Sequence, residues 1–206
     1  ALYLSWGSTY LAIRFALEGG FPPFLLGGVR FLIAGGLMYA VLRWRGVPAP
    51  TRAQWRNAAV MGVLLLVLGN GMVNLAEQTV SSGMTAVAVA SAPLWMGVFA
   101  AMRGERPTRM EWLGRGRDLP SPFMAASAQM LCGGVAMCVL GGLVGERFQA
   151  MPTPGGLAAF AYLIVAGSII GFSAYIWLLQ HVRPALAGSY AYVNPVIAGG
   201  LGAWLA

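Results

Sequence analysis

The sequence predicts an all-helical fold, a polytopic membrane bundle with inverted repeats, and three observations carry this prediction. The first is composition, because 58% of the 206 residues are hydrophobic, 9% are charged and the mean hydropathy is +0.71. Such a chain has too little polar surface to cover a water-soluble domain. The second is a series of apolar windows, each about as long as the 20 residues that cross a membrane as a helix. The third is an internal duplication.

The apolar windows can be placed in order along the chain, and there are about seven of them. They lie near residues 1–17, 24–42, 57–76, 83–102, 122–144, 157–179 and 185–205. Each window is continuously apolar rather than alternating, which favours spanning helices over the strands of a closed barrel.

The duplication is most evident in residues 76–95, which match residues 178–197 at an offset of 102. Each copy is a short polar turn that leads into an apolar helix with a proline near its middle, and each proline is expected to kink its helix. Upstream the match continues at an offset of 99. The pairs at the offset of 102 include Gln78 with Gln180 and Pro93 with Pro195. The pairs at the offset of 99 include Leu32 with Leu131, Gly35 with Gly134 and Met38 with Met137.

The arginines indicate which ends of the windows face the cytoplasm. Residues 43–56 carry four arginines and no acid, and residues 103–118 are also net positive, so both loops are predicted to be cytoplasmic. The loops around Ser81 and Glu146 carry no excess of basic residues and are predicted to lie outside. With this topology the helix that begins near Phe24 and its duplicate near Phe123 run in opposite directions. Inverted repeats of this kind are typical of secondary transporters.

Three stretches resemble the EamA-like transporters of the drug/metabolite transporter superfamily. They are WGSTYLAIRFALEGGFPPFLLGGVRFLIAGGLM (6–38), AEQTVSSGMTAVAVASAPLW (76–95) and SAYIWLLQHVRPALAGSYAYVNPV (173–196). The resemblance implies ten helices in two inverted repeats of five, and export of small metabolites, amino acids or drugs across the bacterial inner membrane.

The chain departs from this pattern in the number of helices. Residues 1–114 resemble helices one to four of the first repeat, and residues 115–206 resemble helices seven to nine of the second. Glu111–Gly114 usually opens the fifth helix, yet Arg115–Arg117 follows at once and leads to the seventh. Helices five, six and ten are therefore missing from the pattern, with a junction near Gly114. A working carrier, a truncated inactive remnant and a non-transporting packing partner all stay open.

The candidate substrate-binding residues are polar and aromatic side chains at membrane depth, where lipid penalises a polar group that has no partner. They are Trp6, Tyr10, Asn70, Asn74, Trp95, Ser173, Trp177, Tyr190 and Asn194. The amides on the third window line a cavity or bond neighbouring helices. Arg30 either extends to the outer surface or binds an anionic group of the substrate, and Glu77 is the candidate carrier if protons drive transport.

Other classes of chemistry find no support in the sequence. His181 has no cysteine or carboxylate at ligand spacing, so we expect no metal and no cofactor. Lysine is absent, which excludes a Walker A loop and hence an ATP-driven pump. No Ser–His pair or pair of membrane carboxylates suggests an enzyme. The net charge of +7 comes from loop arginines and does not indicate nucleic acid binding. The expected partners are a small-molecule substrate and the lipid bilayer, and a homodimer stays open.

Overall fold

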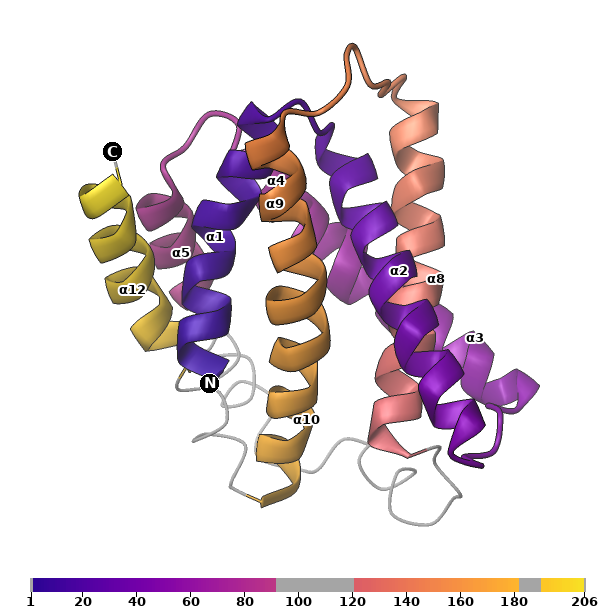
Figure 1. Cartoon of the computed structure of the whole chain (residues 1–206). Helices are drawn as coiled ribbons and strands as arrows, with labels where there is room; N and C mark the ends of the chain where they lie inside the picture. Colours follow the sequence, from indigo (N-terminus) through magenta and orange to yellow (C-terminus); the bar gives the residue numbers. More distant parts are fainter. Residues whose placement is uncertain (1, 92–120, 182–189, 206) are drawn as a thin grey trace, which may run out of the picture.

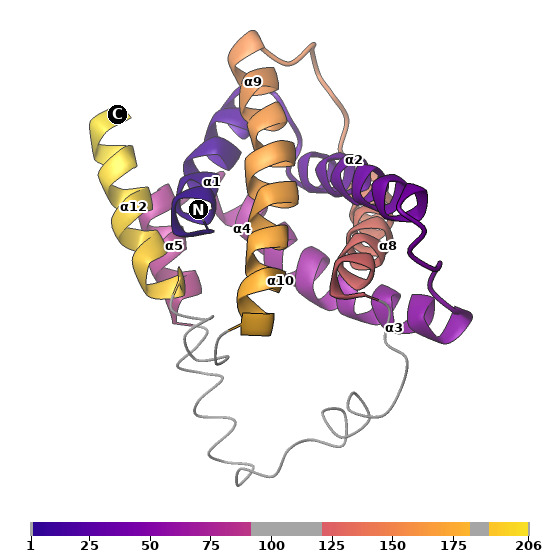
Figure 2. The ribbon, with the colours of Figure 1, turned by 60° about the horizontal axis from the view of Figure 1, so that its bottom comes forward.

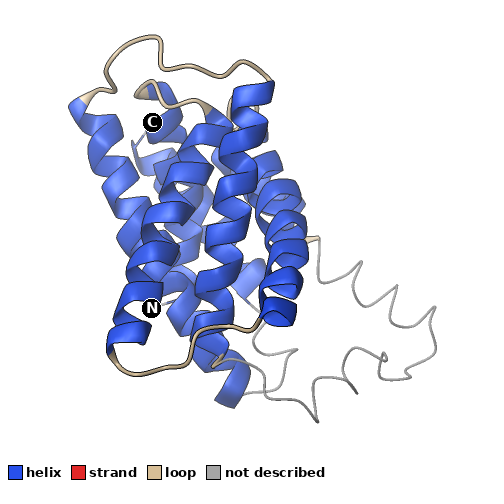
Figure 3. Cartoon of the chain, turned by 90° about the vertical axis from the view of Figure 1, so that its right-hand side faces the viewer, coloured by secondary structure: helices blue, strands red, loops and turns tan. Residues whose placement is uncertain are grey.

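The computed structural model describes residues 2–91, 121–181 and 190–205. Over these ranges the chain forms helices and connecting turns without any strand. Most of the helices are aligned roughly with a common axis, some pointing up it and others down it (Figure 3). Among the described residues, four helices are long and apolar enough to cross a membrane: Pro23–Trp44, Arg52–Ala76, Pro122–Leu143 and Pro154–Leu178. The predicted polytopic helix bundle is confirmed.

The elements follow the predicted windows closely. The first half contains α1 (Leu2–Glu18), α2 (Pro23–Trp44), α3 (Arg52–Gly62), η1 (Val63–Gly71), α4 (Met72–Ala76) and α5 (Ser82–Ala90). The second half contains α8 (Pro122–Leu143), α9 (Pro154–Tyr162), η2 (Leu163–Ile170), α10 (Gly171–His181) and α12 (Tyr190–Leu205). The segments α3, η1 and α4 form one continuous helix, as do α9, η2 and α10. Pro195 lies inside α12, whereas Pro93 falls outside the described residues.

Local sequence signals explain where several helices begin. Proline occupies the first position of α2, α8 and α9, where the missing N–H would have no intrahelical partner anyway. Thr51 and Gln54 form a reciprocal capping box before α3. The carboxylate of Glu146 accepts hydrogen bonds from the backbone N–H of Phe24 and of Leu25, at 3.0 and 2.9 Å. A negative group therefore holds the positive end of the α2 dipole.

The helices α2 and α8 pack against each other in opposite directions (Figure 1). A Cβ on Gly35 would lie 3.0 Å from the carbonyl oxygen of Ser127, and a Cβ on Gly134 would lie 3.0 Å from that of Gly28. Gly134 and Ser127 are the counterparts of Gly35 and Gly28 at the offset of 99. The contact is thus the same when viewed from either helix, as expected for inverted repeats. Glycine is required because any side chain would push the two backbones apart.

Wide, π-helical turns interrupt two of the long helices at equivalent places. They are η1 in the helix that follows α2, and η2 in the helix that follows α8. Such turns are uncommon and frequently occur at functional sites. Their presence in both halves extends the duplication from sequence to backbone conformation.

The first helix occupies the centre of the bundle. It lies between α5 and α12 on one side and α9 with η2 on the other (Figures 1 and 2). Ile13 and Ala16 on α1 are fully buried and pack with Leu26 and Leu163 in one of the apolar clusters. Because α1 is enclosed in this way, Ser5, Thr9 and Tyr10 lie inside the protein rather than against lipid, whereas Arg14 and Glu18 near its end are exposed.

Candidate functional site

A short stretch of α1 presents four polar or amphipathic side chains to its neighbours. Ser5 and Thr9 share one face, and Trp6 and Tyr10 share the adjacent face, because residues four apart are neighbours on a helix. Ser5, Thr9 and Tyr10 are buried, and Trp6 is half-buried. These residues divide the candidate site into one part toward η2 and another toward α5 and α12.

Toward η2, side chains of α1 bind backbone oxygens of the π-helical turns. Ser5 Oγ donates a hydrogen bond to the carbonyl oxygen of Ala166, and Trp6 Nε1 donates to that of Gly167 at 3.1 Å. The ring of Trp6 also contacts Phe172 and Tyr175, with centroid distances of 5.5 and 5.2 Å. The first repeat thus holds the irregular backbone of the second.

Arg30 is buried in the same part of the bundle. Its side chain is 2% exposed, and its Nε donates a hydrogen bond to Ser168 Oγ at 2.7 Å. The guanidinium carbon lies 4.8 Å from the centroid of the Phe31 ring. Of the two interpretations from sequence, extension to the outer surface is wrong, because the side chain points to η2 inside the protein.

Toward α5 and α12, a second polar group surrounds the end of α4. The hydroxyl of Tyr10 lies beside the side chain of Asn194. Ser82 Oγ donates a hydrogen bond to Glu77 Oε2 at 2.7 Å, and Thr85 lies next to the same carboxylate. Side chains from four elements therefore meet at Glu77 and Tyr10.

Three oxygen atoms of this group, and one of Asn74 on α4, lack partners. Within the described residues, the buried atoms without a hydrogen bond are Asn74 Oδ1, Glu77 Oε1, Thr85 Oγ1 and Asn194 Oδ1. The other end of the Asn74 amide is held, since its Nδ2 donates to the carbonyl oxygen of Pro23 at 2.9 Å. Buried polar atoms normally have a partner, so unpaired oxygens mark places for water, a proton or a donor on a ligand.

Glu77 also lines a cavity of about 510 Å³ with Arg14, Glu18, Gln78 and the following turn. It lies directly after the spanning segment Arg52–Ala76. Burial raises the pKa of Glu77 to about 7, although the hydrogen bond from Ser82 and the nearby charge of Arg14 act in the opposite direction. A carboxyl group with this pKa can take up and release protons near neutral pH.

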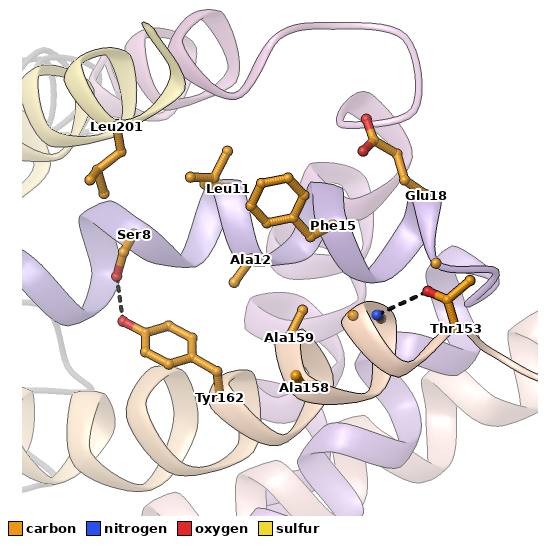
Figure 4. Close-up of a pocket in the computed structure, with 13 residues that line it drawn as sticks. Ser8, Leu11, Ala12, Phe15, Glu18, Thr153, Ala158, Ala159, Tyr162 and Leu201 are labelled. Atoms are coloured by element: carbon orange, nitrogen blue, oxygen red, sulfur yellow. Dashed lines mark hydrogen bonds between the residues drawn. The ribbon is translucent and has the colours of Figure 1, made fainter. Parts of the chain in front are cut away.

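A second, mostly apolar cavity of about 640 Å³ lies between α1, α9 and α12 (Figure 4). Leu11, Phe15 and Leu201 form much of its wall. The hydroxyls of Ser8 and Tyr162 hydrogen-bond at one end of it, at 2.6 Å. The residues that line this cavity do not include those with unpaired oxygens.

The residues predicted from sequence fall into three groups. Trp6, Tyr10 and Asn194 lie in the two polar parts around α1, whereas Asn74 is buried on α4 and bonds Pro23. Asn70 and Ser173 are half-buried, and Trp177 is 54% exposed and stacks on His181 at a centroid distance of 4.2 Å. Trp95 and the side chain of Tyr190 lie outside the described part of the chain. Their role in binding stays a prediction.

The polar residues near the end of the third predicted window differ in burial. Asn74 and Glu77 are buried, Asn70 is half-buried and Gln78 is exposed. The π-helical turns of η1 end at Gly71, so Asn70 precedes a change in helical period that the 3.6-residue repeat does not anticipate.

Sequence reasoning overlooked four hydroxyl residues: Ser5, Thr9, Thr85 and Ser168. All are buried and belong to the polar parts just described. The available signal was the spacing of four between Ser5 and Thr9 in an apolar window. Ser168 gave no such signal, because its role depends on Arg30, which is 138 residues away in the chain.

Comparison with known proteins gives consistent matches along the whole chain. A sequence model of the EamA-like transporter family matches residues 1–116 and, separately, residues 118–206. The chain is 39% identical, over 247 aligned positions, to proteins of Escherichia coli K12 and of E. coli O157:H7, each described as the uncharacterized inner membrane transporter YedA. The alignment covers 100% of this chain and 80% of each relative. No solved structure matches the chain.

The alignment also shows that this chain lacks residues that the relatives have, a difference called the deficit below. It has 247 positions, against 206 residues here, so at least 41 positions of the relatives have no counterpart. That number corresponds to two spanning helices of about 20 residues each.

Proposed function

Since the chain belongs to the EamA-like transporter family, we propose that it is a secondary transporter that exports a small metabolite, amino acid or drug across the bacterial inner membrane. The mirrored contact between α2 and α8 is the observation that carries the proposal. Gly35 meets the carbonyl of Ser127 as Gly134 meets that of Gly28. Two halves that pack symmetrically in opposite directions can exchange conformations, which is the basis of alternating access.

The polar groups support this mechanism because they lie where the two proposed repeats, 1–114 and 115–206, meet. Tyr10 and Glu77 come from the first repeat, whereas Asn194 and Ser168 come from the second. A rocking motion of one repeat against the other would change the distances between these groups. A solute bound among them would then be exposed first to the cytoplasm and afterwards to the outside.

The deficit of 41 positions supports a second candidate, a truncated remnant that is inactive or that only packs with another protein. It has the length of the fifth and sixth helices, which are missing from the family pattern at the junction near Gly114. The sixth helix would be the counterpart of α1 in the second repeat. A homodimer stays a prediction in either case.

Transport by the reconstituted chain separates these candidates. We expect counterflow of at least one solute in proteoliposomes tested with a panel of amino acids and hydrophobic drugs. Asn74→Leu and Asn194→Leu should each abolish that counterflow, because each removes a buried, unpaired oxygen, that of Asn194 from the group at Tyr10 and that of Asn74 from α4.

The matched control is Asn57→Leu, which makes the same chemical change at an exposed position of α3 and should leave counterflow unchanged. Membrane insertion, measured by extraction and gel filtration, should be equal for all three variants. Unchanged counterflow in both Asn74→Leu and Asn194→Leu would remove these residues from the site. Absence of counterflow for every solute would favour the remnant.

A further inference from the structure

Arg30 is a buried cation that has no anionic partner among the residues the structure describes. It lies seven residues after Pro23 on α2, about 10 Å along the helix at 1.5 Å per residue. Charged side chains at this depth are costly in lipid, by about 3 kcal/mol even on lenient scales, and are usually paired. The partner of Arg30 is instead the neutral hydroxyl of Ser168.

The acids that the structure describes are all engaged elsewhere. Glu18 pairs with Arg14 at 2.8 Å, and Glu77 accepts a hydrogen bond from Ser82. Glu146 holds the first N–H groups of α2. Across the described ranges, therefore, no carboxylate neutralises Arg30.

The terminal amino groups of Arg30 are the part that remains available. Guanidinium carries five N–H donors, and the described hydrogen bond to Ser168 uses only the one on Nε. Nη2 points toward Gly167, where a Cβ would lie 3.0 Å from it and 3.2 Å from Thr9 Oγ1. Because position 167 has no side chain, Nη2 and the hydroxyl of Thr9 can both lie against the backbone of η2 there.

We infer that Arg30 binds a carboxylate group of the transported solute, an inference that rests on the proposed transport function. A guanidinium offers two parallel N–H donors, and a carboxylate accepts them with two oxygens in matching geometry. The hydroxyl of Thr9 lies beside the same position, and because its proton is donated to the carbonyl oxygen of Ser5 at 2.8 Å, it can accept an additional hydrogen bond. The bound carboxylate supplies a negative charge that none of the described acids, Glu18, Glu77 and Glu146, places there.

This site exists in one repeat only. The counterpart of Arg30 at the offset of 99 is Gln129 on α8, a neutral amide. The solute would therefore bind in one orientation, with its carboxylate toward α2. The two halves have similar backbone structures, but at this position one carries a positive charge and the other a neutral amide.

Binding of a simple aromatic acid to the purified chain tests the inference without requiring transport. The midpoint of thermal unfolding, Tm, can be followed with a thiol-reactive fluorophore, because Cys132 and Cys138 are free. We expect benzoate to raise Tm saturably, and neither benzamide nor inorganic phosphate to do so. Arg30→Gln should weaken this benzoate effect by about tenfold to a hundredfold, as expected for loss of a charge-assisted hydrogen bond.

Two further variants keep the test decisive. Arg56→Gln removes an exposed arginine of α3 and should retain the full benzoate effect, whereas Arg30→Lys should retain only part of it. In the absence of ligand, Arg30→Gln should match or exceed the wild-type Tm, since it removes an uncompensated buried charge. A lower Tm would assign Arg30 a structural role and overturn the inference.

Equal shifts from benzoate and benzamide, or an effect from phosphate alone, would also overturn it. Either result would leave alternating access untouched, because the assay measures binding only. Conversely, a benzoate effect without any counterflow would retain the carboxylate site and reject the proposed transport.

Discussion

At the scale of single residues, Glu77 is the group whose charge depends most directly on its surroundings. Its carboxylate is buried beside Thr85 and is reached by one hydrogen bond, from Ser82. Tyr10 lies close enough to interact electrostatically with this carboxylate. Arg14 and Glu18 line the same cavity as Glu77. If protons drive export, Glu77 is the residue that would carry them.

The raised pKa of Glu77 predicts how stability depends on pH. The folded protein keeps this proton up to about pH 7, whereas the unfolded chain releases it near the ordinary value of 4.5. The stabilisation that the proton provides is therefore complete below pH 4.5 and is lost as pH rises toward 7. Tm of the wild type, relative to that of Glu77→Gln, should fall across this interval.

A matched control exists on the opposite wall of the same cavity. Glu18→Gln removes an exposed carboxylate that pairs with Arg14, so its Tm profile should still show the decline caused by Glu77. Parallel profiles for the wild type and Glu77→Gln would show that Glu77 titrates at the same pH in the folded and unfolded chains.

At the scale of elements, the contact between α2 and α8 depends on glycines that face the partner helix. Gly35 faces α8 closely, since a Cβ would lie 2.8 Å from Met130 Cβ, whereas a Cβ on the adjacent Gly36 would meet nothing within 4 Å. The two positions differ in their surroundings but not in their helix, which makes them a matched pair.

Replacing each glycine by alanine should have opposite effects. Gly36→Ala should be neutral or stabilise the protein by about 0.5–1 kcal/mol, because alanine favours the helix. Gly35→Ala should destabilise it by about 1–3 kcal/mol through overpacking. Chemical or thermal unfolding in detergent measures the difference, and equal stabilities would contradict the described packing of α2 on α8.

The sequence was sufficient for the elements but not for their irregularities. The apolar windows and the offset of 99 predicted helices and their opposite directions, since both depend on local composition and charge. The π-helical turns were not predictable, because the oxygens of Ala166 and Gly167 are bound by Ser5 and Trp6, residues 161 positions earlier. Burial of Arg30 depends on Ser168 in the same way.

At the scale of the whole molecule, the proposed transport mechanism requires two related halves that cross the membrane in opposite senses. The loop between α2 and α3 and the loop between α8 and α9 are counterparts in the duplication, yet they lie at opposite ends of the bundle (Figure 1). The first carries an excess of arginine, and the second contains Glu146, which caps α2. Opposite location of these two loops is the direct consequence of inversion.

Labelling of single cysteines from each side of the membrane tests this most directly. Ala49 and Ala150 are exposed alanines in the two counterpart loops, and each can be replaced by cysteine after Cys132 and Cys138 are changed to serine. We predict that an impermeant thiol reagent reaches Ala49→Cys only from the cytoplasmic side and Ala150→Cys only from the outer side. Labelling of both positions from the same side would contradict the inverted repeats and the transport mechanism built on them.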